Sequence, residues 1–208
     1  MNEPEPENQS PTDLNHSYDI NTEQTPFFPV SEGKLITLYI LSLGLYGVYW
    51  FYKNWDMQRD KIDKKIYPVW RAIFSIFFTH SLFRRINQQA THLENQHKFN
   101  ANLLATFFVV AIIVSNVLDP FSANTSLLLN MTNNTVIITS FILFFLSVYP
   151  LIKVQATVNR INNDMLGYLN HKFSLWNYVL IIFGSILWLL VVMGVLAELM
   201  GLTEFMAM

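Results

Sequence analysis

Four long apolar runs alternate with polar segments along this chain. They cover roughly residues 35–52, 101–118, 135–152 and 175–200. A hydrocarbon layer about 30 Å thick requires roughly 20 apolar residues of α-helix, because each residue rises about 1.5 Å. Each run reaches about that length once flanking residues and tilt are included. The pattern therefore predicts four membrane-spanning helices.

A fifth apolar and aromatic segment, at about residues 66–86, has an amphipathic pattern. Arg71, Ser75 and Thr79 recur every fourth residue and form a polar stripe, while phenylalanines on the other face can enter acyl chains. A crossing here would place Arg71 in the bilayer, at a cost of about 2.5–3.5 kcal/mol near its centre. We expect an interfacial or shallow re-entrant helix, with a fifth crossing as the alternative.

The first 32 residues differ from the rest in composition. They hold seven acidic residues and five prolines but no lysine or arginine. Such a segment buries too little apolar surface to offset the entropy of ordering it. The sequence therefore predicts a disordered acidic tail over 1–32, a membrane helical domain over 33–202 and a short tail over 203–208. Phe27 and Phe28 are expected to anchor the first span at the interface.

Composition supports the membrane class. The chain is 52% hydrophobic, 15% aromatic and only 13% charged, which is too apolar for an ordinary soluble domain. A length of 208 residues suits one bundle. The expected fold is an all-α integral membrane bundle of four transmembrane helices plus one interfacial or re-entrant amphipathic helix.

The basic residues lie in two segments. Nine lysines and arginines lie in residues 53–98 and three in 153–174, whereas 119–134 has none. Basic loops stay in the cytoplasm. Four spans then predict that both termini and the 119–134 loop lie outside.

The 53–98 segment also contains the candidate binding residues. Each Lys or Arg near an anionic surface contributes about 1 kcal/mol of attraction. We expect a cytoplasmic basic-aromatic face that binds anionic phospholipid or another membrane protein, formed by Lys64, Lys65, Trp70, Arg71, Arg84 and Arg85. The alternative is that these charges only fix the orientation of the chain.

A search for chemical motifs predicts no catalytic residue, metal site or cofactor. The chain lacks cysteine, a Gly-rich phosphate loop, a Gly-x-Ser-x-Gly elbow and a His-Glu-x-x-His pair. We expect a non-enzymatic protein with no nucleic-acid partner. The alternative is a subunit of an oligomeric small-molecule transporter or channel; the oligomeric state stays open.

Several short motifs resemble a family of uncharacterised bacterial multi-pass inner-membrane proteins. They are Gly44-Leu45-Tyr46, Tyr49-Trp50-Phe51-Tyr52-Lys53-Asn54-Trp55, Trp70-Arg71-Ala72, and later Gln155, Asn159 and Asn162. The resemblance covers nearly all of the chain after the tail. It implies a location in the bacterial inner membrane, and it brings no activity or ligand.

Overall fold

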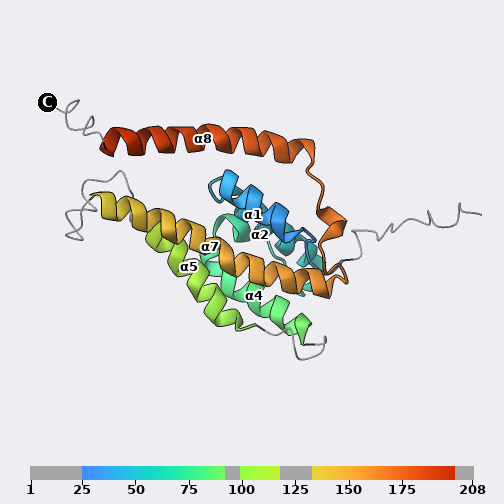
Figure 1. Ribbon diagram of the computed structural model, residues 1–208. Coiled ribbons are helices and arrows are strands. Elements are labelled where there is room, and N and C mark those ends of the chain that lie inside the picture. The colour runs from blue at the N-terminus through green and yellow to red at the C-terminus, as the bar shows by residue number, and fades with distance from the viewer. Residues whose placement is uncertain (1–24, 92–98, 118–132, 200–208) are drawn as a thin grey trace, which may run out of the picture.

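Helices account for every regular element in residues 25–91, 99–117 and 133–199, which the computed structural model describes (Figure 1). In chain order they are α1 (Glu32–Leu41), α2 (Leu45–Met57), α3 (Pro68–Ile73), α4 (Ser75–Ala90), α5 (Ala101–Val117), α7 (Asn133–Ile161) and α8 (Leu175–Leu199). Single turns of 3-10 helix lie at Arg59–Lys61 and Tyr168–Asn170. The predicted all-α class is confirmed.

Two of these helices are long and apolar enough to cross a membrane. The qualifying stretches are Thr135–Ile161 of α7 and Leu175–Ala197 of α8. The 29 residues of α7 rise about 43 Å. The apolar stretch Ala101–Asn116 of α5 is shorter. The runs predicted near 135–152 and 175–200 therefore coincide with helices of membrane-crossing length.

Residues 35–52 do not form the single helix that their hydropathy predicts. Between α1 and α2, Leu43 (φ 51°) and Gly44 (φ 86°) adopt left-handed backbone conformations. A right-handed helix cannot continue through such residues. The Ser42 hydroxyl accepts the Tyr46 N–H at 2.9 Å and completes the turn. The single span predicted over 35–52 is therefore corrected to a helical hairpin, α1–α2.

The α1–α2 hairpin runs alongside only half of α7. Its first residues lie at the C-terminal end of α7, where the Asn159 side chain donates to the Val30 carbonyl oxygen at 3.1 Å. The turn end of α1 lies at the centre of α7, where the Tyr39 hydroxyl is 2.7 Å from the hydroxyl of Ser147, the middle residue of that helix. The ten residues of α1 rise about 15 Å. The hairpin therefore extends from one end of α7 to its midpoint.

The segment before α1 is extended and is held by side-chain amides. Five successive carbonyl oxygens each accept a hydrogen bond from a different Asn or Gln side chain. The pairs are Pro26 with Gln58 (2.6 Å), Phe27 with Asn162 (2.9 Å), Phe28 with Gln155 (3.2 Å), Pro29 with Asn170 (2.9 Å) and Val30 with Asn159 (3.1 Å). Because Gln58 directly follows α2, the end of α2 returns to the end of α7 from which α1 started.

These bonds correct the expected extent of the N-terminal tail. The side chains of Phe27 and Val30 are fully buried. Residues 25–31 therefore belong to the folded domain. The rest of the predicted acidic tail, residues 1–24, and the short tail over 203–208 lie outside the described residues.

The amphipathic helix predicted over 66–86 is divided into two helices. α3 and α4 meet at Phe74, whose backbone (φ −95°, ψ 39°) leaves the helical region. Ser75 lines a cavity of about 290 Å³ together with Gly44 of the hairpin turn and Phe144 of α7. The two helix breaks therefore lie at the same level, close to the centre of α7.

Helix α8 lies along one side of the molecule, with α1 between it and α7 (Figure 1). The Trp188 indole N–H donates to the Ile40 carbonyl oxygen at 2.8 Å, and its ring stacks on that of Phe145. Gly184 meets the Leu41 carbonyl so closely that no side chain fits between them. Large apolar side chains on the rest of α8 are exposed, among them Leu175, Trp176, Ile182, Phe183, Ile186 and Leu189. An apolar surface of this extent is typical of an interaction with a membrane or another protein.

Candidate functional site

Three of the predicted binding residues, Arg71, Arg84 and Arg85, meet in one pocket. Its volume is about 330 Å³, and the remaining lining residues are Trp55, Ile62, Ser81 and Gln88. The end of α2, the loop after it, α3 and the second half of α4 all contribute. The turn at Phe74 allows residues from α3 and α4 to lie on the same pocket.

Arg71 is held between two aromatic rings. Its guanidinium carbon lies 4.3 Å from the Trp55 ring centroid and 5.1 Å from that of Phe78. Stacking of this kind suits the flat guanidinium group and leaves its N–H edge for other partners. Burial lowers the pKa of Arg71, and the charge of Arg85 lowers it further. Trp55 and Phe78 therefore hold the Arg71 guanidinium at a place where burial and the Arg85 charge disfavour its positive charge.

Arg85 is incompletely hydrogen-bonded. Its Nη2 donates weakly to the Lys61 carbonyl oxygen at 3.4 Å, and its buried Nε has no acceptor among the described residues. The indole N–H of Trp55, a residue 1% exposed, also lacks an acceptor there. Burial lowers the pKa of Lys61, and the Arg85 charge lowers it further. Two residues that line the pocket thus hold buried donors that an added acceptor would satisfy.

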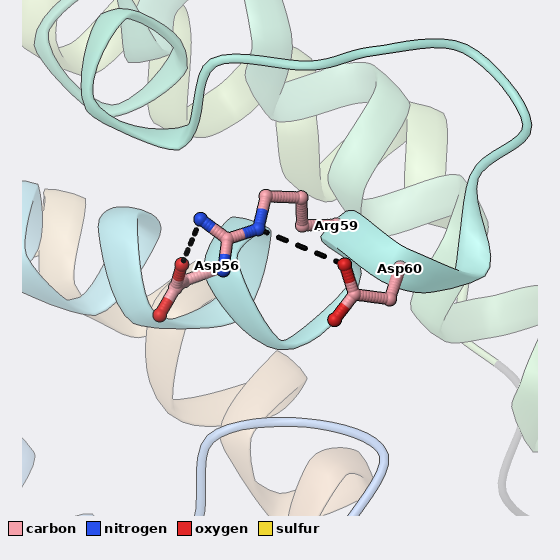
Figure 2. A network of polar contacts seen from close by, with 3 residues as sticks. All are labelled: Asp56, Arg59 and Asp60. Atoms are coloured by element: carbon pink, nitrogen blue, oxygen red, sulfur yellow. Dashed lines mark ion pairs between the residues drawn. The ribbon is translucent and has the colours of Figure 1, made fainter.

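None of the described residues that line the pocket is acidic. Both ion pairs found in the described part of the chain belong to Arg59, which binds Asp56 at 3.5 Å and Asp60 at 3.8 Å (Figure 2). Arg84 instead donates from Nε to the carbonyl oxygen of His80 at 3.3 Å. Three guanidinium groups without a counter-charge form a site that suits a phosphate or carboxylate, which guanidinium binds through paired N–H groups.

The other three predicted residues lie outside the pocket. Lys64 and Lys65 are exposed in the loop before α3, and the Lys65 ammonium lies over the Tyr67 ring at 5.5 Å. Trp70 is 59% exposed and stacks on Phe74, with 5.9 Å between ring centroids. The structure therefore divides the predicted basic-aromatic face into a pocket of arginines and a separate exposed surface.

The exposed surface is an apolar stripe along α3 and the start of α4. It consists of Trp70, Ile73, Phe74 and Phe77, spaced as on one helical face. Each is 46% exposed or more. The stripe begins next to Arg71, so an apolar surface and a cationic pocket adjoin each other.

Comparison of this chain with protein-family models, with curated proteins and with solved structures finds no match. The family resemblance of the sequence motifs therefore stays a prediction.

Sequence reasoning missed the uncharged half of the pocket. Trp55, Ser81 and Gln88 line it, and none of the three is among the binding residues that the sequence predicts. The spacing held a signal, because Ser81, Arg84, Arg85 and Gln88 recur at helical intervals of three and four.

In the described residues, no group of three or more His, Asp or Glu side chains is placed to hold a metal ion.

Proposed function

We propose that this chain is an integral membrane protein that crosses the bilayer three times, through α5, α7 and α8. Support comes from the length and hydropathy of α7 and α8. The 17 residues of α5 rise about 25 Å, which is near the lower limit for a crossing. The α1–α2 hairpin reaches the middle of α7 and returns, so it enters the membrane without crossing it. Such interrupted backbone is tolerated where protein surrounds it.

Three crossings change the expected position of the N-terminus. The segment before α1 is hydrogen-bonded to side chains between residues 155 and 170. It is also hydrogen-bonded to Gln58, which directly precedes the loop at 59–67. The loop at 59–67 and the wider segment 153–174 each have more basic than acidic residues, and basic segments stay in the cytoplasm. The N-terminus then lies in the cytoplasm, and the C-terminus and residues 118–132 lie on the opposite side. In the bacterial inner membrane that the motif resemblance implies, the opposite side is the periplasm.

We further propose that the protein is a non-enzymatic lipid-binding protein, with the arginine pocket holding the anionic headgroup of a phospholipid at the cytoplasmic surface. The observation that carries this proposal is the meeting of Arg71, Arg84 and Arg85 in a pocket that no described acidic residue lines. The neighbouring apolar stripe from Trp70 to Phe77 supports it, since exposed aromatic and aliphatic side chains of this kind can contact acyl chains.

Two matched double variants test the headgroup site. Arg84→Gln/Arg85→Gln removes two charges from the pocket, whereas Lys64→Gln/Lys65→Gln removes two charges from the same basic segment outside it. Each double variant removes two positive charges from the basic segment 53–98, so the two variants change the charge that orients the chain equally. Native mass spectrometry after reconstitution with phosphatidylglycerol or phosphatidylcholine measures the retained lipid.

We expect the arginine variant to lose one bound phosphatidylglycerol per chain that both the wild type and the lysine variant retain. Equal retention by the two variants, with both inserted and folded, contradicts a pocket-specific site. It would leave the charges with the single role of orienting the chain.

A channel or transporter subunit is the second candidate. The observation in its favour is the cavity between the two helix breaks at the level of the α7 centre, to which Ser75, Ser115 and Asn116 contribute polar groups. Broken helices near the midplane line substrate paths in many transporters. Swelling of proteoliposomes in glycerol tests this function: we expect uptake that Ser75→Leu abolishes, and uptake equal to that of empty liposomes rejects it.

A further inference from the structure

A second cavity lies on the other side of the α1–α2 hairpin, between α2 and the start of α8. Its volume is about 450 Å³, within the range of small-molecule sites. Its lining includes Lys34, Lys172, Leu45, Tyr46, Tyr49 and Leu180. None of the residues that line it in the described structure is acidic.

Lys34 gives this cavity a buried positive charge. The side chain is 5% exposed, and its ammonium donates to the Asn170 Oδ1 and to the Lys172 carbonyl oxygen, both at 2.6 Å. An ammonium has three N–H donors, so one remains. No carboxylate of the described residues lies within ion-pair distance of Lys34. A buried charge without an opposite charge is costly.

Two further sources of positive electrostatic potential lie close to the Lys34 ammonium. Lys34 lies in the first turn of α1, where the aligned peptide dipoles already give a positive potential. The exposed Lys172 lines the same end of the cavity. Glu32 in the same turn offsets the helix dipole in part, but it does not line the cavity and forms no ion pair with Lys34 in the described structure. An anion bound in the cavity would offset the remaining positive charge.

The cavity becomes apolar along the hairpin. Lys34 belongs to the first turn of α1, whereas Leu45 follows the turn at its far end. The part of α1 from Lys34 to its end at Leu41, which rises about 10 Å, lies between the two. Tyr46, Tyr49 and Leu180 line the same cavity from α2 and α8. The site therefore has a cationic end at the basic surface and an apolar end toward the centre of α7.

We propose that this cavity binds one amphiphile with an anionic head and an acyl chain. Its carboxylate or phosphate oxygen lies on Lys34 and Lys172, and its chain lies between α2 and α8 toward Leu45. The site does not share a lining residue with the arginine pocket. It is therefore independent of the headgroup site proposed above.

Variants at the two ends of the cavity test this proposal on the full chain. Lys34→Gln removes the charge and keeps a hydrogen-bonding side chain for Asn170. Leu180→Trp fills the apolar end and leaves every charge in place. Lys153→Gln is the control, because Lys153 is an exposed cation on α7 that lines neither pocket. Native mass spectrometry counts the retained molecules of oleate, phosphatidylglycerol or phosphatidylcholine.

We expect the wild type and Lys153→Gln to retain one anionic molecule more than tenfold better than phosphatidylcholine, and both cavity variants to lose it. Retention of oleate alone identifies a fatty acid as the ligand, and retention of phosphatidylglycerol identifies a phospholipid. Undiminished retention in the folded Leu180→Trp variant, or equal retention of phosphatidylcholine by the wild type, overturns the proposal. Arg84→Gln/Arg85→Gln separates the sites: this variant keeps the molecule bound in the cavity and loses only a phosphatidylglycerol held by the headgroup site, so a wild type with phospholipid at both sites retains two.

Discussion

The side chain of Asn162 forms both possible hydrogen bonds with the backbone of Phe27, 135 positions earlier in the chain. Its Nδ2 donates to the Phe27 carbonyl oxygen at 2.9 Å, and its Oδ1 accepts the Phe27 N–H at 3.3 Å. The pair joins the segment before α1 to the residue that follows α7. Both partners are buried, so neither bond can be replaced by bulk water.

Replacing Asn162 by Leu should free the extended segment. The change leaves the Phe27 N–H and carbonyl unpaired, and each such buried group costs about 1–3 kcal/mol. Hydrogen exchange of the amides in residues 25–31 should therefore become much faster. Asn116→Leu is the control, because the hydrogen bond of that exposed side chain within the described structure is to Ile112 of its own helix. Unchanged exchange in Asn162→Leu would show that the segment is held without this pair.

The side of the membrane on which the N-terminus lies distinguishes three crossings from four. The chain has no cysteine, so single substitutions can be labelled without background. We expect Ser17→Cys and Asp63→Cys to react with an impermeant maleimide from the cytoplasmic side. Ser126→Cys and Thr203→Cys should react from the opposite side. Labelling of Ser17→Cys and Ser126→Cys from the same side of the membrane would restore the four-span topology.

The hairpin turn depends on Gly44. Its φ of 86° is a conformation that costs an L side chain about 1–2 kcal/mol. Gly44→Ala should therefore lower the free energy of unfolding by about that amount, measured by equilibrium denaturation in micelles. Gly33→Ala is the matched control, because a Cβ there meets no atom within 4 Å. If the two variants are equally stable, backbone strain at the turn is negligible.

The attachment of α8 depends on Gly184. A side chain at this position collides with the backbone of Leu41, so Gly184→Val should push α8 away from α1. Overpacking of this kind costs about 1–3 kcal/mol. Thermal denaturation should show the loss, while Ser185→Val, at the exposed neighbouring position, should leave the midpoint unchanged. A stable Gly184→Val variant would mean that α8 docks elsewhere.

The sequence predicts the helical class and the long helices well, because both follow from averages over many residues. α7 and α8 lie where 18 or more apolar residues run together. The same averaging fails over 35–52. Two residues, Leu43 and Gly44, reverse the chain there without lowering its hydropathy. Only Gly44 marked the turn, and glycines also occur inside membrane helices.

The sequence predicts the charges of the site but not their grouping. Arg71, Arg84 and Arg85 belong to the same basic segment as Lys64 and Lys65, and only the fold separates them. Lys34, which lines the second cavity, is not among the binding residues that the sequence predicts. Its partner Asn170 is 136 positions away, so no local pattern connects them.

The five amide bonds to residues 26–30 also set an order of assembly during biosynthesis. Gln58 aside, the donors lie between residues 155 and 170. Chains leave the ribosome N-terminus first. The carbonyls before α1 therefore remain bonded to water until α7 and the turn after it have been translated. The helical hairpin that comes first in the sequence is thus among the last to reach its final position.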